Sequence, residues 1–306
     1  MSDRRDTGCV VESYGRRVVV ERAAGEQVAC KLKRRNLDLV AGDDVRLEHH
    51  VGDDEWTVVE RLPRRNVLCR SDSRGRSESL AANLDQLGVV VAPRPACDPF
   101  VVDRYLAGAA YAGIAGLLVV NKQDLLADAG DLSFVEPYRA LGLPVVTVSA
   151  KAGTGLDALI ERLSGRRSLL AGQSGVGKSS LLNALAGEAV RATGALSTGS
   201  GEGRHTTVSS AILRTPWGEI ADSPGVRDYA PPVVALTDVQ SGFAEVVALA
   251  SSCRFQDCLH MREPQCAVQA AVEAGTIDAR RYESYRRLLN LTRQLDERRG
   301  WGSDGA

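Results

Sequence analysis

The chain has 306 residues, of which 44% are hydrophobic and 25% are charged, and its net charge is −1. This composition is typical of a soluble globular protein with two or three domains, and no apolar run is long enough to span a membrane. The near-neutral charge excludes binding to nucleic acid through a global basic excess, so RNA contacts would have to come from local patches. Because residues 1–6 lack the apolar core of a signal peptide, we expect a cytoplasmic protein without membrane contact.

Residues 1–66 are expected to form a small all-β domain. Short β-rich runs recur at residues 9–11, 18–21, 28–32, 45–47 and 56–59, with turn residues between them. This spacing suits a closed barrel such as an OB-fold, although an unrelated small β-domain fits the pattern about as well. An OB-fold would offer an RNA-binding surface, on which cations either contact phosphates or merely solvate strand edges. These cations are Arg16, Arg17, Lys31, Lys33, Arg34 and Arg35.

A basic segment between residues 61 and 76 follows. Its Ser-Gly-Arg composition predicts a mobile loop. The loop is either a solvated connector or an RNA-facing arm between domains, and we favour the arm. Its arginines are Arg61, Arg64, Arg65, Arg70, Arg74 and Arg76.

Residues 67–231 alternate strands and helices. Continuous apolar runs at residues 87–92 and 117–120 predict buried parallel strands, with a crossover helix over residues 103–113 between them. Further strands are expected at residues 145–148 and 168–171, and a helix over residues 178–186. This order predicts an α/β domain with a mostly parallel sheet.

A phosphate loop joins the strand at residues 168–171 to the following helix. Its glycines let main-chain N–H groups point at phosphate oxygens, and the helix presents its N-terminus to the same anion. Lys178 is expected to reach the β- and γ-phosphates, and Ser179 to bind Mg²⁺. The expected nucleotide-binding residues here are Gly172, Gln173, Ser174, Gly175, Val176, Gly177, Lys178, Ser179 and Ser180.

Two motifs select guanine over adenine. Asp124 can accept hydrogen bonds from N1–H and the exocyclic amine of guanine, a donor pair that adenine lacks. Asn121 can bond the base and tie neighbouring loops together, Lys122 can cover the ring face, and the Ala150 N–H can reach the guanine O6. Each motif follows a predicted strand, at the sheet edge where ligands bind. The motifs are Asn121-Lys122-Gln123-Asp124 and Ser149-Ala150-Lys151.

Asp222-Ser223-Pro224-Gly225 completes the set after a strand expected at residues 218–221. Asp222 would hold Mg²⁺ through water, and the Gly225 N–H would sense the γ-phosphate. In an ordinary GTPase the phosphate loop precedes the guanine motif, whereas here it follows it. The order therefore predicts a circularly permuted GTPase.

Residues 232–306 are expected to be helical, with the clearest helices at residues 238–249 and 282–297. A Cys-x4-Cys-x-His-x5-Cys cluster lies between them and supplies a full tetrahedral set for a closed structural Zn²⁺ site, the alternative being buried thiols beside a histidine. A catalytic zinc is disfavoured because no coordination position stays open. The ligands are Cys253, Cys258, His260 and Cys266, whereas Cys9, Cys30, Cys69 and Cys97 are interpreted as ordinary thiols.

The last predicted helix is amphipathic and basic. Its buried stripe is expected to be Tyr285, Leu288, Thr292 and Leu295, and Glu283 can pair with Arg287 one turn later. The helix is either simply solvated or contacts rRNA. The arginines concerned are Arg280, Arg281, Arg286, Arg287, Arg293, Arg298 and Arg299.

Over nearly its whole length the chain resembles the ribosome small-subunit-dependent GTPases of the RsgA (YjeQ/EngC) type. The resemblance is carried by residues 81–86 (AANLDQ), 103–106 (DRYL), 203–207 (GRHTT) and the Cys/His cluster. It implies an OB-fold RNA-binding domain at residues 1–66, a circularly permuted GTPase domain at residues 67–231 and a helical zinc-binding domain at residues 232–306.

The same resemblance implies a slow GTPase that hydrolyses GTP to GDP and phosphate and is stimulated by the small (30S) ribosomal subunit. Such a protein acts late in maturation of that subunit and helps to release assembly factors. Its expected partners are the subunit with its 16S rRNA, GTP or GDP and other assembly factors, and its expected ions are one structural Zn²⁺ and a Mg²⁺ bound with GTP. We expect a monomer.

The chain lacks the usual water-orienting residue of a GTPase. Val226 stands where many GTPases carry a glutamine that orients the attacking water, and valine cannot do so. His205 is our candidate for that role and Thr207, ahead of Thr206, our candidate for a switch Mg²⁺ ligand; the alternative for His205 is an ordinary surface histidine. Without such a group the chain would be a GTP-regulated rRNA-binding module with negligible hydrolysis. A P-loop small-molecule kinase is disfavoured because it has no use for the guanine motif.

Overall fold

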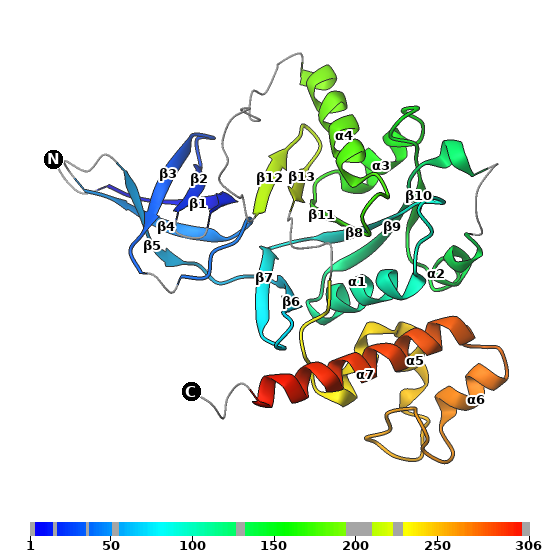
Figure 1. Cartoon of the computed structure of the whole chain (residues 1–306). Helices are drawn as coiled ribbons and strands as arrows, with labels where there is room; N and C mark the ends of the chain where they lie inside the picture. Colours follow the sequence, from blue (N-terminus) through cyan, green and yellow to red (C-terminus); the bar gives the residue numbers. More distant parts are fainter. Residues whose placement is uncertain are drawn as a thin grey trace.

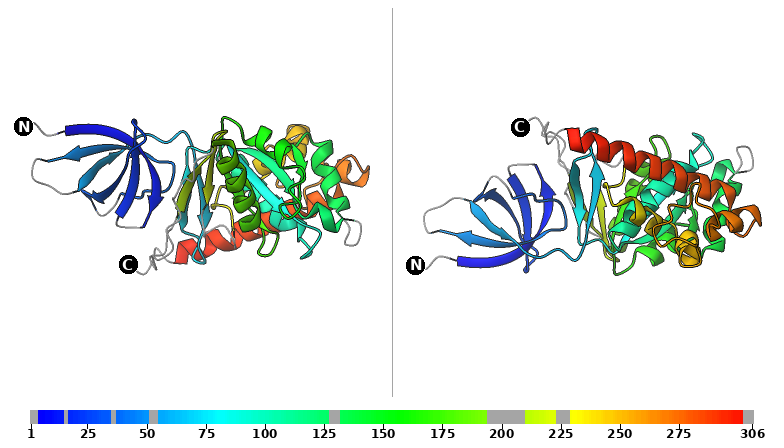
Figure 2. Two further views of the ribbon diagram at one scale, coloured as in Figure 1. Left: turned by 90° about the horizontal axis from the view of Figure 1, so that it is seen from above. Right: turned by 90° about the horizontal axis from the view of Figure 1, so that it is seen from below.

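The computed structural model describes residues 4–14, 17–34, 37–50, 55–126, 132–193, 210–222 and 229–301. A small β-barrel, an α/β domain and a set of C-terminal helices follow one another along the chain (Figure 1). The barrel stands at one end of an elongated molecule when it is seen from above or below (Figure 2). Among the described helices, none has the length and apolar character needed to cross a membrane.

The barrel confirms the predicted closed, OB-like domain. Its strands pair in the order β1-β2-β3-β5-β4, and β4 returns to pair with β1, which closes the ring. Alternate side chains point inward, and Val10, Val20 and Leu47 are fully buried in its core. The strands are β1 (Arg4–Ser13), β2 (Arg17–Arg22), β3 (Gln27–Leu32), β4 (Asp44–His49) and β5 (Trp56–Arg61).

The segment after the barrel is a hairpin, so the predicted mobile loop is wrong from residue 67 onward. β6 (Val67–Ser71) pairs with β7 (Ser77–Ala82) in a separate two-stranded sheet. The Asp72 carboxylate accepts hydrogen bonds from the Arg74 and Arg76 N–H groups and closes the turn. Composition alone suggested a loop because it does not show which acidic residues the arginines meet. Arg76 pairs with Asp72 in the turn and Arg70 pairs with Glu78 across the hairpin, each at 2.8 Å.

The α/β domain has the predicted, mostly parallel sheet. Its strand order is β10-β9-β8-β11-β13-β12, and only β12 runs antiparallel to its neighbour. α1 and α2 pack on one face and α3 and α4 on the other (Figure 1). The strands are β8 (Gln86–Val91), β9 (Ala115–Val120), β10 (Val145–Thr147), β11 (Arg167–Ala171), β12 (Ser210–Arg214) and β13 (Glu219–Asp222). The helices are α1 (Pro99–Tyr111), α2 (Glu136–Ala140), α3 (Leu156–Leu163) and α4 (Lys178–Thr193).

The C-terminal part differs from prediction in one helix. Instead of one helix over residues 238–249, a 3-10 helix (η4, Leu236–Gly242) ends at Phe243, and α5 (Ala244–Ala250) begins after it. The break follows from long-range packing, because a Cβ on Gly242 would lie 2.6 Å from the Ala107 Cβ on α1. Two more helices follow, α6 (Ala267–Glu273) and α7 (Ala279–Trp301). The predicted buried stripe of α7 is confirmed at Tyr285, Leu288, Thr292 and Leu295.

Several arginines of α7 bind other parts of the protein. Arg287 lies 3.7 Å from Asp98 and stacks over Phe100, whereas Glu283 pairs with Arg286, so the predicted Glu283–Arg287 pair is wrong. Arg280 and Arg281 contact the buried Asp103 of α1. Some of the arginines of this helix therefore hold it against the α/β domain.

Candidate nucleotide site and metal cluster

The phosphate loop and the guanine motif lie at the same edge of the sheet. Each follows a parallel strand, β11 and β9, and so emerges from the carboxyl ends where ligands bind in such folds. The loop needs its glycines. Gly172 has a φ of 142° and a Cβ there would collide with the Val90 carbonyl oxygen, while a Cβ on Gly177 would lie 2.5 Å from the Asn121 amide nitrogen.

Asn121 joins three of the predicted motifs. Its side-chain Nδ2 donates to the Val176 carbonyl oxygen of the phosphate loop at 3.0 Å. Its Oδ1 accepts from the Ala150 N–H at 3.1 Å. The side chain is 1% exposed, so these bonds are made in a buried setting. The structure thus brings together the phosphate loop, the guanine motif and the Ser-Ala-Lys motif that are scattered over the sequence.

Lys122 lies against the phosphate loop. Its backbone is left-handed, with a φ of 61°. Its Nζ donates to the carbonyl oxygens of Gly175 at 2.7 Å and Arg94 at 2.8 Å. The loop after β8 therefore also supports the site through the Arg94 carbonyl oxygen, a contact for which no sequence motif exists.

Asp124 is held ready to accept hydrogen bonds. The Ser149 hydroxyl donates to its carboxylate at 2.5 Å and itself accepts from the Ala152 N–H at 3.1 Å. The Ser149 hydrogen bond is the main reason that the pKa of Asp124 lies below its ordinary value, since it favours the charged form. Because the side chain is exposed, the ionised carboxylate is accessible to a purine edge.

Lys178 folds back onto its own loop. Its Nζ donates to the carbonyl oxygens of Gly172 at 2.6 Å and Gln173 at 2.8 Å. A phosphate in the loop would offer this ammonium group a charged partner, which makes a stronger hydrogen bond than a carbonyl oxygen. Ser179 and Ser180 are exposed at the start of α4.

Asp222 ends β13 beside the phosphate loop. β13 runs parallel to β11, with Ala221 opposite Leu169, so Asp222 is exposed at the edge from which the loop leaves β11. Three further candidates, His205, Thr207 and Gly225, fall outside the described residues, and their roles stay predictions.

The four candidate zinc ligands form one cluster. Their ligand atoms all lie within 4.8 Å of one another. Cys253 Sγ is 3.8 Å from Cys266 Sγ, and His260 Nδ1 is 3.4 Å from Cys266 Sγ. Tetrahedral Zn²⁺ with bonds of about 2.3 Å to sulfur and about 2.0 Å to nitrogen requires separations of about 3.5–3.8 Å. Cys253, His260 and Cys266 therefore have the separations of a tetrahedral metal site, and the Cys258 sulfur lies within 4.8 Å of their ligand atoms as the fourth candidate.

Groups around the cluster orient it. Gln240 Oε1 lies 3.0 Å from His260 Nε2, which leaves Nδ1 directed at the thiols. The Tyr282 hydroxyl donates to the His260 carbonyl oxygen at 2.5 Å, and the Tyr285 hydroxyl donates to the Leu259 carbonyl oxygen at 2.8 Å. The cluster is thereby fixed to α7. The sequence carried no spacing signal for these supporting residues.

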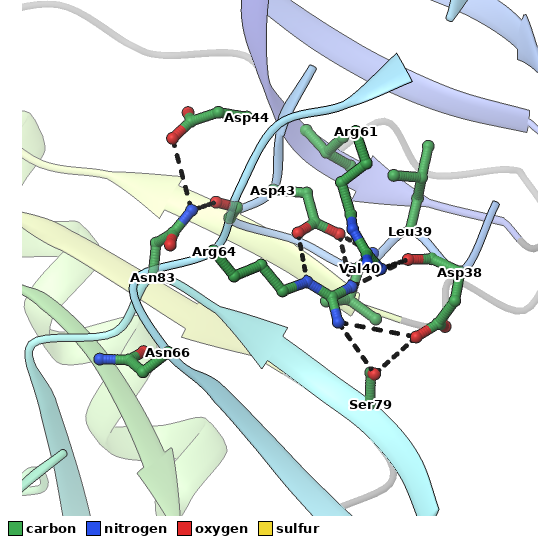
Figure 3. A network of polar contacts seen from close by, with 12 residues as sticks. Asp38, Leu39, Val40, Asp43, Asp44, Arg61, Arg64, Asn66, Ser79 and Asn83 are labelled. Atoms are coloured by element: carbon green, nitrogen blue, oxygen red, sulfur yellow. Dashed lines mark hydrogen bonds and ion pairs between the residues drawn. The ribbon is translucent and has the colours of Figure 1, made fainter. Parts of the chain in front are cut away.

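The proposed RNA-facing arm begins inside a protein interface. Arg64 is 12% exposed and binds the fully buried Asp43 of the barrel through two hydrogen bonds, at 2.7 and 2.8 Å (Figure 3). It also donates to the Ser79 hydroxyl of the hairpin at 3.2 Å. Arg64 thus joins the barrel to the hairpin, and it is a structural residue, contrary to the prediction.

Comparisons with known proteins agree with this geometry. A family model described as RsgA GTPase matches residues 61–231. The chain is 41% identical over 291 residues to the small ribosomal subunit biogenesis GTPase RsgA of Ectopseudomonas mendocina, covering 92% of this chain and 84% of the relative. It is 42% identical over 294 residues to the protein of the same name from Pseudomonas aeruginosa strain LESB58, covering 95% and 86%.

Solved structures of the same architecture exist. The crystal structure of YjeQ from Thermotoga maritima matches with a TM-score of 0.72 and 30% identity, over 94% of this chain and 99% of that one. YloQ, described as a circularly permuted GTPase, matches with a TM-score of 0.71 and 25% identity, over 95% and 96%. The likeness thus extends over all three parts of the molecule.

Proposed function

This chain belongs to the RsgA GTPase family and is a GTP hydrolase, and from that premise we propose which residues bind the nucleotide and with which partner the protein works. GTP binds where the phosphate loop, the guanine motif and the Ser-Ala-Lys motif meet. The observation that carries this proposal is the buried Asn121 amide, which bonds both other motifs. We also propose domain boundaries near residues 66 and 231, close to the limits of the family-model match.

Recognition and charge neutralisation fall to different residues of this site. Asp124 accepts from the guanine edge, Lys122 covers the ring, and the Ala150 N–H faces O6. Lys178 and the phosphate-loop N–H groups bind the phosphates. Ser179, Thr207 and Asp222 would hold Mg²⁺, which neutralises charge on the phosphates when it is bound.

His205 is proposed to orient the attacking water, because Val226 cannot hydrogen-bond it. Replacing His205 with Ala should lower turnover while the affinity for GTP stays near that of the wild type. Unchanged turnover would remove His205 from the mechanism.

The proposed partner is the small ribosomal subunit with its 16S rRNA. The relatives named above carry subunit biogenesis in their names, and exposed cations of the barrel, such as Arg34, support an RNA surface. We propose stimulation of hydrolysis by this subunit, action late in its maturation with release of assembly factors, a structural Zn²⁺ at the Cys/His cluster, and a cytoplasmic, monomeric protein.

A change of base specificity tests the nucleotide site. In Asp124→Asn the amide should donate to O2 of xanthine and no longer accept from both guanine donors. We therefore expect the variant to hydrolyse xanthosine triphosphate faster than GTP. Steady-state phosphate release, with and without purified small subunits, measures both rates. Asp157→Asn, the same substitution at an exposed position of α3 outside the motifs, is the matched control. If Asp124→Asn still preferred GTP, or if the wild type released no phosphate in either condition, the proposal would fail.

A further inference from the structure

β12 joins the barrel to the strand that carries Asp222. It pairs with β1 on one side, where Ser13 is opposite Ser210 and Glu12 opposite Ala211. It pairs with β13 on the other side, where Ala211 is opposite Asp222. A barrel residue, a β12 residue and the proposed Mg²⁺ residue therefore lie in one line across three hydrogen-bonded strands.

The barrel also reaches into the α/β domain with one turn. A Cβ on Gly42, whose φ is 95°, would collide with the Ala82 carbonyl oxygen, so the two backbones touch. The Gly42 carbonyl oxygen accepts from Asn83 Nδ2 at 2.8 Å and from the Arg167 guanidinium at 3.0 Å. This turn, residues 39–43, is fixed from its other side by the Asp43–Arg64 pair (Figure 3).

Ser210 connects this turn to β12. Its hydroxyl accepts from the Ala41 N–H at 2.9 Å, and the residue is 2% exposed. Ser13, opposite it on β1, donates its hydroxyl to the Leu39 carbonyl oxygen at 3.0 Å. Two buried hydroxyls thus hold the turn at the end of β12 nearest to Asp222.

The far end of β12 is joined to the barrel differently. Arg214 pairs with Glu21 of β2 at 2.7 Å, and its side chain is 42% exposed. An exposed ion pair of this kind contributes little to the position of a strand. The two ends of β12 therefore differ in how firmly they connect the barrel to Asp222. The connection is firmer at Ser210, because loss of its buried hydrogen bond would leave a buried polar group without a partner.

We propose that Ser210 is a positioning residue for GTP hydrolysis. It ties the turn of residues 39–43 to the strand line that ends in Asp222, so a partner bound to the barrel alters the geometry at Asp222 and thereby turnover. The partner acts only to the extent that it binds the two arrangements with different affinity. The inference rests on the proposed role of Asp222.

Ser210→Ala, Ser210→Thr and Glu21→Gln test this inference in the full-length protein. Ser210→Ala should lower kcat in the presence of purified small subunits about fivefold, the effect of roughly one hydrogen bond, with KM for GTP unchanged. Ser210→Thr keeps the hydroxyl and should restore kcat. Glu21→Gln breaks the ion pair at the far end of β12 and should leave kcat within about twofold of the wild type.

A binding measurement separates positioning from general weakening of the fold. The dissociation constant of a non-hydrolysable GTP analogue is measured with Mg²⁺ and with EDTA. In Ser210→Ala the factor by which Mg²⁺ tightens binding should become smaller, while the dissociation constant in EDTA stays that of the wild type. If Ser210→Ala does not fold, Ser13→Ala removes the neighbouring hydroxyl and should give the same changes.

The inference would be overturned if folded Ser210→Ala kept the wild-type kcat and the wild-type effect of Mg²⁺ on binding. It would also be overturned if Glu21→Gln lost as much kcat as Ser210→Ala. Either result would leave the proposed GTPase function standing. Absence of any hydrolysis by the wild type would overturn the function and this inference with it.

Discussion

The α/β domain is joined to its two neighbours by different kinds of contact. Its junction with the barrel is a main-chain ladder between β1 and β12, supported by the Asp43–Arg64 pair. Its junction with the C-terminal helices is made by side chains, and no strand pairing crosses it within the described ranges. At its centre Asp103 of α1, fully buried, binds Arg280 and Arg281 of α7.

The difference has consequences for how each neighbour is held. The barrel junction is divided among several bonds, because two residue pairs of the ladder, the Ser210–Ala41 bond and the two bonds to the Gly42 carbonyl oxygen all cross it. The helical junction has one buried ionic centre, the Asp103 carboxylate, which also accepts from the Tyr138 hydroxyl at 2.5 Å, while Arg281 is additionally bound by Glu245 at 2.8 Å. Around this centre lie the exposed Arg287–Asp98 pair and the apolar packing of Ala107. We therefore expect single substitutions to break the helical junction more readily than the barrel junction.

Loss of the metal should disrupt the helical junction more than any other change that we predict. Structural zinc contributes roughly 10–16 kcal/mol of binding free energy in small zinc domains, and here the cluster is tied to α7 through Tyr282 and Tyr285. Cys266→Ser, or chelation of the wild type, should unfold the cluster and free α7 from α1. Hydrogen exchange should then rise across α7 and stay slow in β1 and β12.

Cys97→Ser is the matched control for metal loss, because this half-buried thiol lies outside the cluster. It should retain one metal per chain in native mass spectrometry. A metal-free protein with native exchange rates in α7 would contradict the zinc proposal, because the contacts between α7 and α1 would then hold the helix without the metal.

Breaking the ionic centre of the helical junction should come next in size. Asp103→Asn keeps the shape but removes the carboxylate that Arg280 and Arg281 share, so that Arg281, whose side chain is 5% exposed, keeps only Glu245 as a buried counter-charge. Removal of one partner costs about 3–5 kcal/mol where the remaining charge has no other partner, and the Glu245 carboxylate places the expected loss at the lower end, about 3 kcal/mol. The free energy of unfolding, measured in urea, should fall by that amount. Asp98→Asn, which breaks the exposed pair with Arg287, should cost about 1 kcal/mol or less, and equal losses in the two variants would refute the argument.

The sequence predicted those parts of the fold that depend on local pattern. The five barrel strands and the buried strands β8 and β9 were found because their hydrophobic periodicity is a property of the strand itself. The hairpin β6–β7 was missed because its charges are neutralised across the turn. The break at Phe243 was missed because it depends on contact between Gly242 and α1, which lies far away in the sequence.

The same division holds for the candidate sites. Asn121, Asp124, Lys178 and the Cys/His cluster are recognisable because their chemistry requires fixed spacings. Their supports are not, since Gln240 reaches His260 and Arg94 reaches Lys122 only after the chain has folded. The register line from Glu12 to Asp222 is likewise a tertiary feature, because strand partners cannot be derived from one strand alone.

The smallest predicted effect concerns an ion pair beside the barrel junction. Burial of the Asp85 carboxylate opposes its ionisation, but hydrogen bonds from the Arg167 N–H and the Arg65 guanidinium outweigh this and lower its pKa. A depressed pKa in the folded state means that the carboxylate stabilises the protein at pH values above its unfolded pKa, about 3.9, and that this contribution is lost as the pH falls through the folded value.

Asp85→Asn should therefore lower the free energy of unfolding at pH 7 by about 1 kcal/mol or less, because Asp85 is partly exposed and solvent screens the pair. The difference from the wild type should stay constant down to about pH 5 and then shrink as acid removes the charge from the wild type as well. Urea unfolding at several pH values measures it. A difference that grows on acidification would mean that the pKa of Asp85 is raised, not lowered, in the folded protein, and would contradict the prediction.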